Sequence, residues 1–294
     1  MRIVFIGCVE SSARLLRRLI KMKADVVGVL TQKESAYNTD FADIEKICNE
    51  NKLDCMCVKN INTIVVEEYI RERRPDIIFC FGWSQLIRKE ILDIPKYGCV
   101  GFHPADLPNN KGRHPIIWAL VLGLEETAST FFMMNEKADD GEILSQKKVE
   151  IKYTDNARIL YDKIMDIAEE QVEEIVKQLN EGKLVKDKKT GDEGNSWRKR
   201  GIEDGRIDWR MSSRSIYNLV RGLSKPYVGA HFVYKDCSCK VWRVEEVRTE
   251  NYLNIEPGKV IKVFPDGTFW VKAGENVVHI IEFDEIEIKE GIYL

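Results

Sequence analysis

The sequence predicts an α/β protein in two parts, a parallel sheet covered by helices and then a smaller all-β domain. The first observation is the order strand, helix, strand at the start of the chain. Apolar runs at 2–7 and 24–31 flank a helical pattern that ends at Lys21. The other is a change of period near residue 230, where short strand patterns separated by turns replace the alternation. Such strands are typical of a small barrel or sandwich. A chain of 294 residues has room for two domains.

The alternation of strands and helices continues to about residue 180. Apolar runs predict further strands at 54–58, 75–83, 99–103, 128–134 and 144–151. Helical patterns lie at 41–51, 62–74, from 86 onward, after His114, and at 156–180, where Gly182 stops the longest one. A charged, glycine-rich stretch at 186–195 predicts a surface linker or hairpin. Beyond a short helix at 214–223, strands are expected at 231–234, 240–247, 258–264, 268–273 and 276–283.

The composition is that of an ordinary soluble globular protein, with 44% apolar and 32% charged residues. The net charge of −3 is nearly balanced and does not indicate a nucleic-acid binder. The first residues form a short apolar run that resembles a strand and not a signal peptide. The longest apolar run, 115–124, is half the length of a membrane span. We therefore expect a cytoplasmic protein with no membrane partner.

The cysteines and glycines argue against metal and dinucleotide sites. No Cys-x-x-Cys pair occurs among the eight cysteines, and no two histidines share the spacing of metal ligands, so we expect no metal. Cys80 and Cys99 lie in apolar strand patterns, where a free thiol behaves as a small hydrophobic group. The turn after the first strand carries only Gly7, without the Gly-x-Gly-x-x-Gly pattern, which disfavours a nicotinamide or flavin cofactor.

The stretch from 98 to 144 carries most of the candidate chemistry. His103 ends an expected strand, at the edge where open α/β sheets place their ligands. A loop containing Lys111 and Arg113 follows, and Asp139 stands in a later turn that ends with Gly141. A lone histidine after a strand is more often structural, but a carboxylate that holds an imidazole fixes its tautomer and raises its basicity. We therefore predict that His103 and Asp139 are catalytic.

Four motifs, in this order along the chain, resemble the folate-dependent formyltransferase family. They are Gly101-Phe102-His103-Pro104-Ala105-Asp106-Leu107-Pro108 with Lys111-Gly112-Arg113, then Asp139-Asp140-Gly141-Glu142-Ile143-Leu144, Glu203-Asp204-Gly205-Arg206-Ile207-Asp208-Trp209, and Val220-Arg221-Gly222-Leu223-Ser224-Lys225-Pro226-Tyr227-Val228-Gly229-Ala230. The family includes methionyl-tRNA formyltransferase and sugar N-formyltransferases, and the last motif most resembles enzymes acting on nucleotide-linked amino sugars. The resemblance covers nearly the whole chain. It implies a Rossmann-like catalytic domain at 1–206 and an OB-like β-barrel at 207–294.

The resemblance also implies a set of binding residues. The co-substrate would be 10-formyltetrahydrofolate, contacted by Phe81, Gly82, Trp83, Leu86, Ile87 and Asp140. For Leu86, core packing is an equally good interpretation. The acceptor would meet Ser12, Lys59, Lys111 and Arg113. Ser12 could equally cap a helix, and Lys59 could pair with a diphosphate as a point charge or remain a solvated lysine at a strand end.

One family position does not match, because Gly101 stands where the family has an asparagine. That asparagine is expected to donate a hydrogen bond to the formyl oxygen as negative charge develops there. Loss of one such donor typically costs about 10²–10³ in rate. A water or backbone N–H could replace it, His103 could act alone, or the enzyme could be degenerate. Since His103 and Asp139 are retained in otherwise intact motifs, we favour an active enzyme.

The acceptor is inferred from charge and from the second domain. Residues 210–294 contain 12 Lys and Arg against 12 Asp and Glu, and this neutrality disfavours a tRNA, whose phosphates need a basic surface. The motif at 203–209 and the domain after it argue against a purine-pathway formyltransferase or a formylfolate hydrolase. We therefore favour a nucleotide-linked amino sugar and no nucleic-acid partner, with methionyl-tRNA as the alternative acceptor. A degenerate folate- or nucleotide-sugar-binding protein is the non-enzymatic alternative, and the sequence leaves a homodimer open.

Overall fold

The computed structural model describes residues 1–33, 40–183 and 194–294. The expected linker at 186–195 therefore lies almost entirely outside the described residues. The chain forms two compact units, the first made of Met1–Gly112, Thr127–Val149 and Asp162–Trp197. The second is made of Arg113–Glu126, Glu150–Tyr161 and Arg198–Leu294. These units are not the contiguous ranges 1–206 and 207–294, because two earlier segments pack within the second unit.

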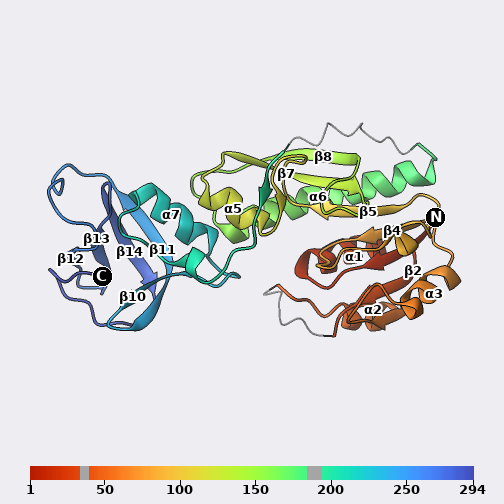
Figure 1. Ribbon diagram of the computed structural model, residues 1–294, viewed down its shortest axis with the longest axis horizontal. Coiled ribbons are helices and arrows are strands. Elements are labelled where there is room, and N and C mark those ends of the chain that lie inside the picture. Colours follow the sequence, from red (N-terminus) through yellow and green to blue (C-terminus); the bar gives the residue numbers. More distant parts are fainter. Residues whose placement is uncertain (34–39, 184–193) are drawn as a thin grey trace. The chain divides into compact units, whose positions relative to one another are not determined.

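The first unit is built on a sheet whose described strands run in the order β3-β2-β1-β4-β5-β7-β8. The strands are β1 (Arg2–Ile6), β2 (Asp25–Thr31), β3 (Cys55–Cys57), β4 (Ile77–Cys80), β5 (Cys99–His103), β7 (Glu126–Met133) and β8 (Ile143–Glu150). The pairs from β3 through β5 are parallel, as the sequence predicts. However, β7 runs antiparallel to β5, so the sheet is mixed and not wholly parallel (Figure 1).

Helices connect these strands at most of the expected places. They are α1 (Glu10–Lys21), α2 (Ile44–Asn51), α3 (Ile64–Glu72), α4 (Lys89–Leu92), α5 (Pro115–Val121) and α6 (Ala157–Asn180). The helix expected from 86 onward is wrong in its first turn. There the side chain of Asn62 bonds the carbonyl of Leu86 and the N–H of Arg88, and these bonds hold the chain in a loop.

The core of the first unit contains a cluster of phenylalanine rings where β1, β4, β5 and β7 meet. Phe81 makes edge contacts with Phe5 and Phe131 and stacks on Phe79, with ring centroids 5.3–5.7 Å apart. These four side chains are fully buried. Aromatic pairs of this kind stabilise a core beyond the area that they bury. The cluster fixes the carboxyl ends of the central strands, where the candidate site lies.

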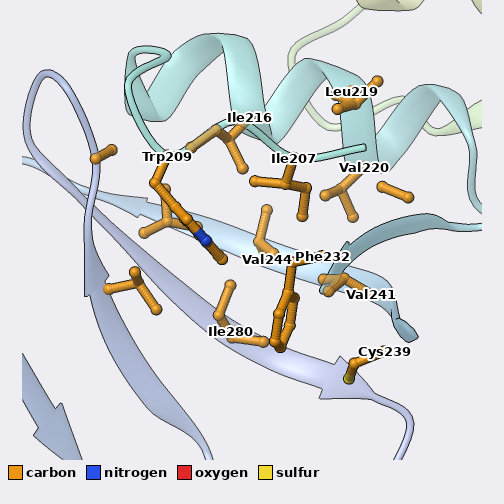
Figure 2. Packing of buried hydrophobic residues seen from close by; sticks show 14 of the residues in the cluster. Ile207, Trp209, Ile216, Leu219, Val220, Phe232, Cys239, Val241, Val244 and Ile280 are labelled. Atoms are coloured by element: carbon orange, nitrogen blue, oxygen red, sulfur yellow. The ribbon is translucent and has the colours of Figure 1, made fainter. Parts of the chain in front are cut away.

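The second unit contains an antiparallel sheet whose described strands run in the order β10-β11-β14-β13-β12. The strands are β10 (Ala230–Tyr234), β11 (Cys237–Val247), β12 (Val260–Val263), β13 (Phe269–Lys272) and β14 (Val277–Phe283), and α7 (Ser213–Gly222) precedes them. Figure 2 shows Ile216 and Val220 of α7 on the side that faces Phe232, Val241, Val244 and Ile280 of the strands, and Leu219 belongs to the same buried cluster. The predicted second domain of short strands is therefore confirmed.

Two further features complete the fold. A short parallel pair, β6 (Lys111–Gly112) with β9 (Ser196–Trp197), was not predicted, because strands of two residues have no hydrophobic period. Helix α5 packs on α7, and Ile117 joins the apolar cluster of the second unit.

Within the described residues, none of the helices has the length and apolar character needed to cross a membrane.

Removal of the Phe232 ring should strongly destabilise the second unit. Phe232 is 1% exposed and contacts Trp209, with ring centroids 5.6 Å apart. Phe232→Ala should lower the free energy of unfolding by about 3–5 kcal/mol, because it leaves a cavity in a close-packed core. Val233→Ala is the control, since Val233 is 39% exposed on the opposite face of the same strand. Urea unfolding measures both, and equal losses would contradict this account of the core.

Candidate active site

His103 is held at the carboxyl end of β5 by a backbone carbonyl. His103 is 5% exposed, and its Nε2 atom lies 2.8 Å from the carbonyl oxygen of Asn110. A carbonyl oxygen only accepts hydrogen bonds, so Nε2 carries the proton in this arrangement. Asn110 itself adopts a left-handed conformation with φ of 61°, and its N–H donates to Oδ1 of Asn195 at 2.9 Å. The imidazole is thus oriented by a turn seven residues further along the chain.

Asp139 approaches the other side of the imidazole. Its Oδ1 lies 3.7 Å from Nδ1 of His103, and its Oδ2 accepts the N–H of Gly112 at 3.0 Å. Asp139 also has a positive φ of 51°, which asparagine and aspartate tolerate better than most residues. The predicted pair of His103 and Asp139 is therefore brought together, at a distance slightly longer than a hydrogen bond.

A buried ion pair fixes the two loops to each other. Nζ of Lys111 lies 3.1 Å from Oδ1 of Asp140, and both side chains are largely buried. The side-chain amide of Asn135 donates to the carbonyl of Asp140 at 2.8 Å. Loss of one partner of such a pair leaves an uncompensated charge, at a cost of about 3–5 kcal/mol. In this structure Lys111 and Asp140 therefore shape the loops on which His103 and Asp139 depend, and their contact with ligands stays a prediction.

The position of Gly101 leaves no room for a side chain. Gly101 lies opposite Phe132 in the antiparallel pair of β5 with β7. A Cβ atom at Gly101 would stand 2.7 Å from Cζ of Phe132 and 3.0 Å from Cγ of Met134. The phenyl ring therefore fills the space in which the family's asparagine would stand. The absence of an asparagine at position 101 and the presence of the Phe132 ring opposite it are therefore linked by packing.

Two turns at the carboxyl ends of β1 and β4 are joined through Ser12. Its hydroxyl is fully buried, donates to the carbonyl of Phe81 at 2.5 Å and accepts the N–H of Val9 at 3.2 Å. Ser12 thus fills the capping role considered from the sequence, and contact with an acceptor would require these bonds to break. Gly82 has φ of 67°, and a Cβ there would stand 2.2 Å from Val9. Only glycine fits this turn without strain.

The segment after Gly82 has both buried and exposed apolar groups. Leu86 is 57% exposed, whereas Ile87 is 2% exposed and Phe81 is fully buried in the core. The core-packing interpretation of Leu86 is therefore not supported. Phe81 is a core residue whose N–H donates to the carbonyl of Ile6 and whose carbonyl accepts the Ser12 hydroxyl, so its contact with a ligand stays a prediction. The indole N–H of Trp83 is buried with no hydrogen-bond partner among the described residues, which is costly unless a ligand or water supplies one.

Lys59 lies next to this segment. Its carbonyl accepts the side-chain amide of Gln85 at 2.7 Å, and Oε1 of Gln85 accepts the N–H of Ile61 at 3.0 Å. This places Lys59 beside the turn that follows β4, although its contact with an acceptor stays a prediction. Arg113 belongs to the second unit and is exposed. No group of three or more metal-ligating side chains comes together in the part of the chain that the structure describes.

The arrangement is suited to proton transfer. With a proton already on Nε2, uptake of a second proton at Nδ1 produces an imidazolium between a carbonyl oxygen and a carboxylate, and both stabilise the charge. A base of this kind accepts a proton from an amine that attacks a carbonyl carbon. The geometry therefore supports acyl transfer to an amine.

The comparisons with known families agree with this chemistry. The model of the formyl transferase family matches residues 1–176, and the model of the formyl transferase C-terminal domain matches residues 201–290. This chain belongs to the formyl transferase family. The formyltransferase has the catalytic α/β domain and the β domain that the sequence motifs predict, and the prediction of an enzyme of this family is confirmed.

A curated relative and two solved structures extend the likeness. Methionyl-tRNA formyltransferase of Caldanaerobacter subterraneus is 32% identical over 97% of this formyltransferase and 92% of its own length. An N-formyltransferase from Helicobacter canadensis, solved with folinic acid and dTDP-3-aminofucose, is 16% identical with a TM-score of 0.72, covering 96% of this chain and 99% of its own. HypX from Aquifex aeolicus with tetrahydrofolic acid is 18% identical with a TM-score of 0.68, covering 100% of this chain but 46% of its own. The two structures show the shared fold.

Sequence reasoning missed some residues that build the site. Asn110 orients His103 through its backbone carbonyl, which leaves no trace in the type of residue. In the sequence, Phe132 is one apolar residue of an expected strand, and Asn135 lies outside the recognised motifs. The signals that could have found them are weak: an asparagine favours the left-handed turn at position 110, and a glycine in a strand invites a large neighbour.

Replacement of either catalytic candidate should abolish most turnover. His103→Gln and Asp139→Asn should each lower the rate of formyl transfer by roughly 10²–10⁴, because the amine proton loses its acceptor or the imidazolium loses its counter-charge. Asp106→Asn is the matched control, since Asp106 follows His103 in the same loop but its carboxylate pairs with Lys148 at 2.7 Å. Thermal melting should show folded protein in each case. Near-parental rates in either variant would refute the assignment.

Restoring the family's asparagine should not restore the missing donor. Gly101→Asn should lower the free energy of unfolding by about 1–3 kcal/mol without raising turnover, because Phe132 occupies the space. The double variant Gly101→Asn with Phe132→Leu should recover part of this loss. A double-mutant cycle by urea unfolding measures the coupling between the two positions. Additive losses would show that the ring does not exclude the side chain.

Proposed function

We propose that this formyltransferase moves a formyl group from 10-formyltetrahydrofolate to the amine of methionyl-tRNA. The observation that carries the choice of acceptor is the similarity to methionyl-tRNA formyltransferases, which extends over 97% of this chain and 92% of the first relative. The sequence alone favoured a nucleotide-linked amino sugar and no nucleic-acid partner. The comparisons support the alternative acceptor better, since the sugar enzymes share the fold at less than 25% identity.

The turns after β1 and β4 fit a bound folate. Trp83 has an indole N–H without a partner among the described residues, and Leu86, three residues further along the chain, has an exposed apolar side chain. Gly82 lets the backbone approach a ligand closely. Folate ligands in HypX and in the Helicobacter canadensis enzyme are consistent with this assignment. When bound, 10-formyltetrahydrofolate supplies the formyl carbon.

The chain's own residues would manage the proton. The attacking amine loses a proton as the new C–N bond forms, and His103 accepts it with Asp139 holding the resulting charge. Oδ2 of Asp139 stays bound to the N–H of Gly112, so the carboxylate does not rotate away. A donor to the developing oxyanion would come from a water or a backbone N–H, because no side chain stands at Gly101 and the two nitrogens of His103 face the carbonyl of Asn110 and the carboxylate of Asp139.

A nucleotide-linked amino sugar is the second candidate acceptor. The charge balance of 12 against 12 in residues 210–294 favours it, as does the motif at 220–230. Lys59 lies beside the turn that follows β4, where its ammonium group would suit a diphosphate. Neither observation outweighs the full-length similarity to enzymes that act on tRNA.

A turnover assay with a panel of acceptors tests the proposal. Purified protein and 10-formyltetrahydrofolate would be mixed with initiator methionyl-tRNA, or with UDP- and dTDP-linked 3-amino and 4-amino sugars, and release of tetrahydrofolate followed by absorbance. We expect turnover with methionyl-tRNA and none with the sugars. His103→Gln is the control for enzymatic transfer.

The remaining outcomes decide between the alternatives. Turnover with one sugar alone would reject the tRNA assignment and name the substrate. If no acceptor is formylated but folate binding is retained in a calorimetric titration, the enzymatic proposal is rejected for both acceptors. That result would favour a degenerate binding protein.

A further inference from the structure

A segment far along the chain, residues 194–197, lies against the loop that follows β5. The carbonyl of Asn195 accepts the N–H of Lys111 at 3.1 Å, and the pair of β6 with β9 continues this contact. A Cβ atom at Gly194 would stand 2.2 Å from the carbonyl oxygen of Pro108, so the two backbones are in close contact there as well. All of these residues belong to the first unit. The loop is therefore held along its length by a distant piece of backbone.

The side chain of Asn195 adds a hydrogen bond that holds the turn at Asn110. Its Oδ1 accepts the N–H of Asn110 at 2.9 Å, next to the backbone bond that Asn195 makes with Lys111. Asn110 has φ of 61°, in the left-handed region, which is unfavourable unless neighbouring contacts hold it. Asn195 binds two successive peptide N–H groups of the loop, and in this way it fixes the direction of the Asn110 carbonyl.

The carbonyl of Asn110 decides which nitrogen of His103 carries the proton. It lies 2.8 Å from Nε2, while Oδ1 of Asp139 lies 3.7 Å from Nδ1. Both oxygens accept hydrogen bonds, and a neutral imidazole has one N–H for the two of them. The closer carbonyl therefore keeps the proton on Nε2 and leaves the lone pair on Nδ1. If the carbonyl moved away, the carboxylate would draw the proton to Nδ1.

The rest of the loop is held by groups other than the side chain of Asn195. The ion pair of Lys111 with Asp140 and the backbone pair of β6 with β9 do not involve it. Asn195 is exposed, so shortening its side chain opens no cavity in the core. Loss of the side chain should therefore release the turn at Asn110 without unfolding the loop.

We infer that Asn195 is a positioning residue for the base of the reaction, because through Asn110 it fixes which nitrogen of His103 carries the proton. The inference rests on the proposed function, since formyl transfer needs a base with a free lone pair. It holds for either acceptor, because the amine of each loses a proton when the new bond forms. The position of the proton on His103 can be measured without turnover, so the positioning role and the proposed function can be tested separately.

Two variants of Asn195 separate positioning from general stability. Asn195→Ala removes the oxygen that holds Asn110, and Asn195→Asp keeps an oxygen at the same exposed place. Asn156→Ala is the matched control, since Oδ1 of Asn156 accepts the N–H of Ile159 at 3.0 Å at the start of α6. This control loses the same kind of bond in the second unit.

Nitrogen-15 NMR at mildly alkaline pH measures the position of the proton. Comparison with His103→Gln identifies the ring signals of His103 among those of the four histidines. We expect the proton on Nε2 in the parental protein, in Asn195→Asp and in Asn156→Ala. In Asn195→Ala the signals should shift toward a proton on Nδ1, because the carbonyl no longer faces Nε2.

Steady-state kinetics measures the consequence for turnover. Asn195→Ala should lower kcat by about 10- to 100-fold with little change in KM, because the base is misplaced after the substrates bind. Asn195→Asp should recover most of this loss, since a carboxylate oxygen also accepts the N–H of Asn110. Asn156→Ala should keep the parental kcat.

The other outcomes decide between the alternatives. A parental protein with the proton on Nδ1, or an Asn195→Ala variant with the parental tautomer or the parental kcat, would overturn the inference. A loss of kcat that Asn195→Asp does not recover, or that Asn156→Ala shares, would also overturn it, because the effect would be one of stability. A proton shift in Asn195→Ala without formylation by the parental protein would support the positioning of His103 and reject the proposed function.

Discussion

The candidate site depends on the attachment of one irregular loop to one turn. The N–H of Gly112 binds Asp139, Lys111 binds Asp140, and the carbonyl of Asn110 binds His103. Both Asn110 and Asp139 adopt left-handed conformations, which cost energy unless surrounding contacts hold them. The ion pair and the hydrogen bonds supply those contacts. A histidine and an aspartate that lie 36 residues apart in the sequence thereby become a pair oriented for proton transfer.

The same loop also pairs with a segment far along the chain. Lys111 and Gly112 pair with Ser196 and Trp197, so the segment that leaves the first unit is fixed beside the loop that carries the site. The loop that orients His103 is thus held to a distant segment by one short piece of backbone, which explains why a two-residue strand pair matters in a protein of this size.

The substitution at Gly101 shows how packing constrains chemistry. In an antiparallel pair, directly opposite residues share the space above the sheet, and here a Cβ atom at Gly101 would stand 2.7 Å from the ring of Phe132. A change from asparagine to glycine is therefore not an isolated loss of a donor, because the neighbouring strand has a ring where the amide would be.

The sequence by itself determined the order of strands and helices, the two-domain organisation and the family, because hydrophobic periods and glycine-bounded motifs are local signals. It also predicted His103 and Asp139 as a catalytic pair, and the structure places Nδ1 of His103 3.7 Å from Oδ1 of Asp139. It did not predict the antiparallel β7, since strand direction is set by how a connection returns to the sheet. Only the tertiary structure revealed the carbonyl of Asn110 on His103, the burial of Ser12 and Ile87, and the pairing of Lys111 and Gly112 with Ser196 and Trp197. These depend on contacts between segments far apart in the chain, which a local pattern does not encode.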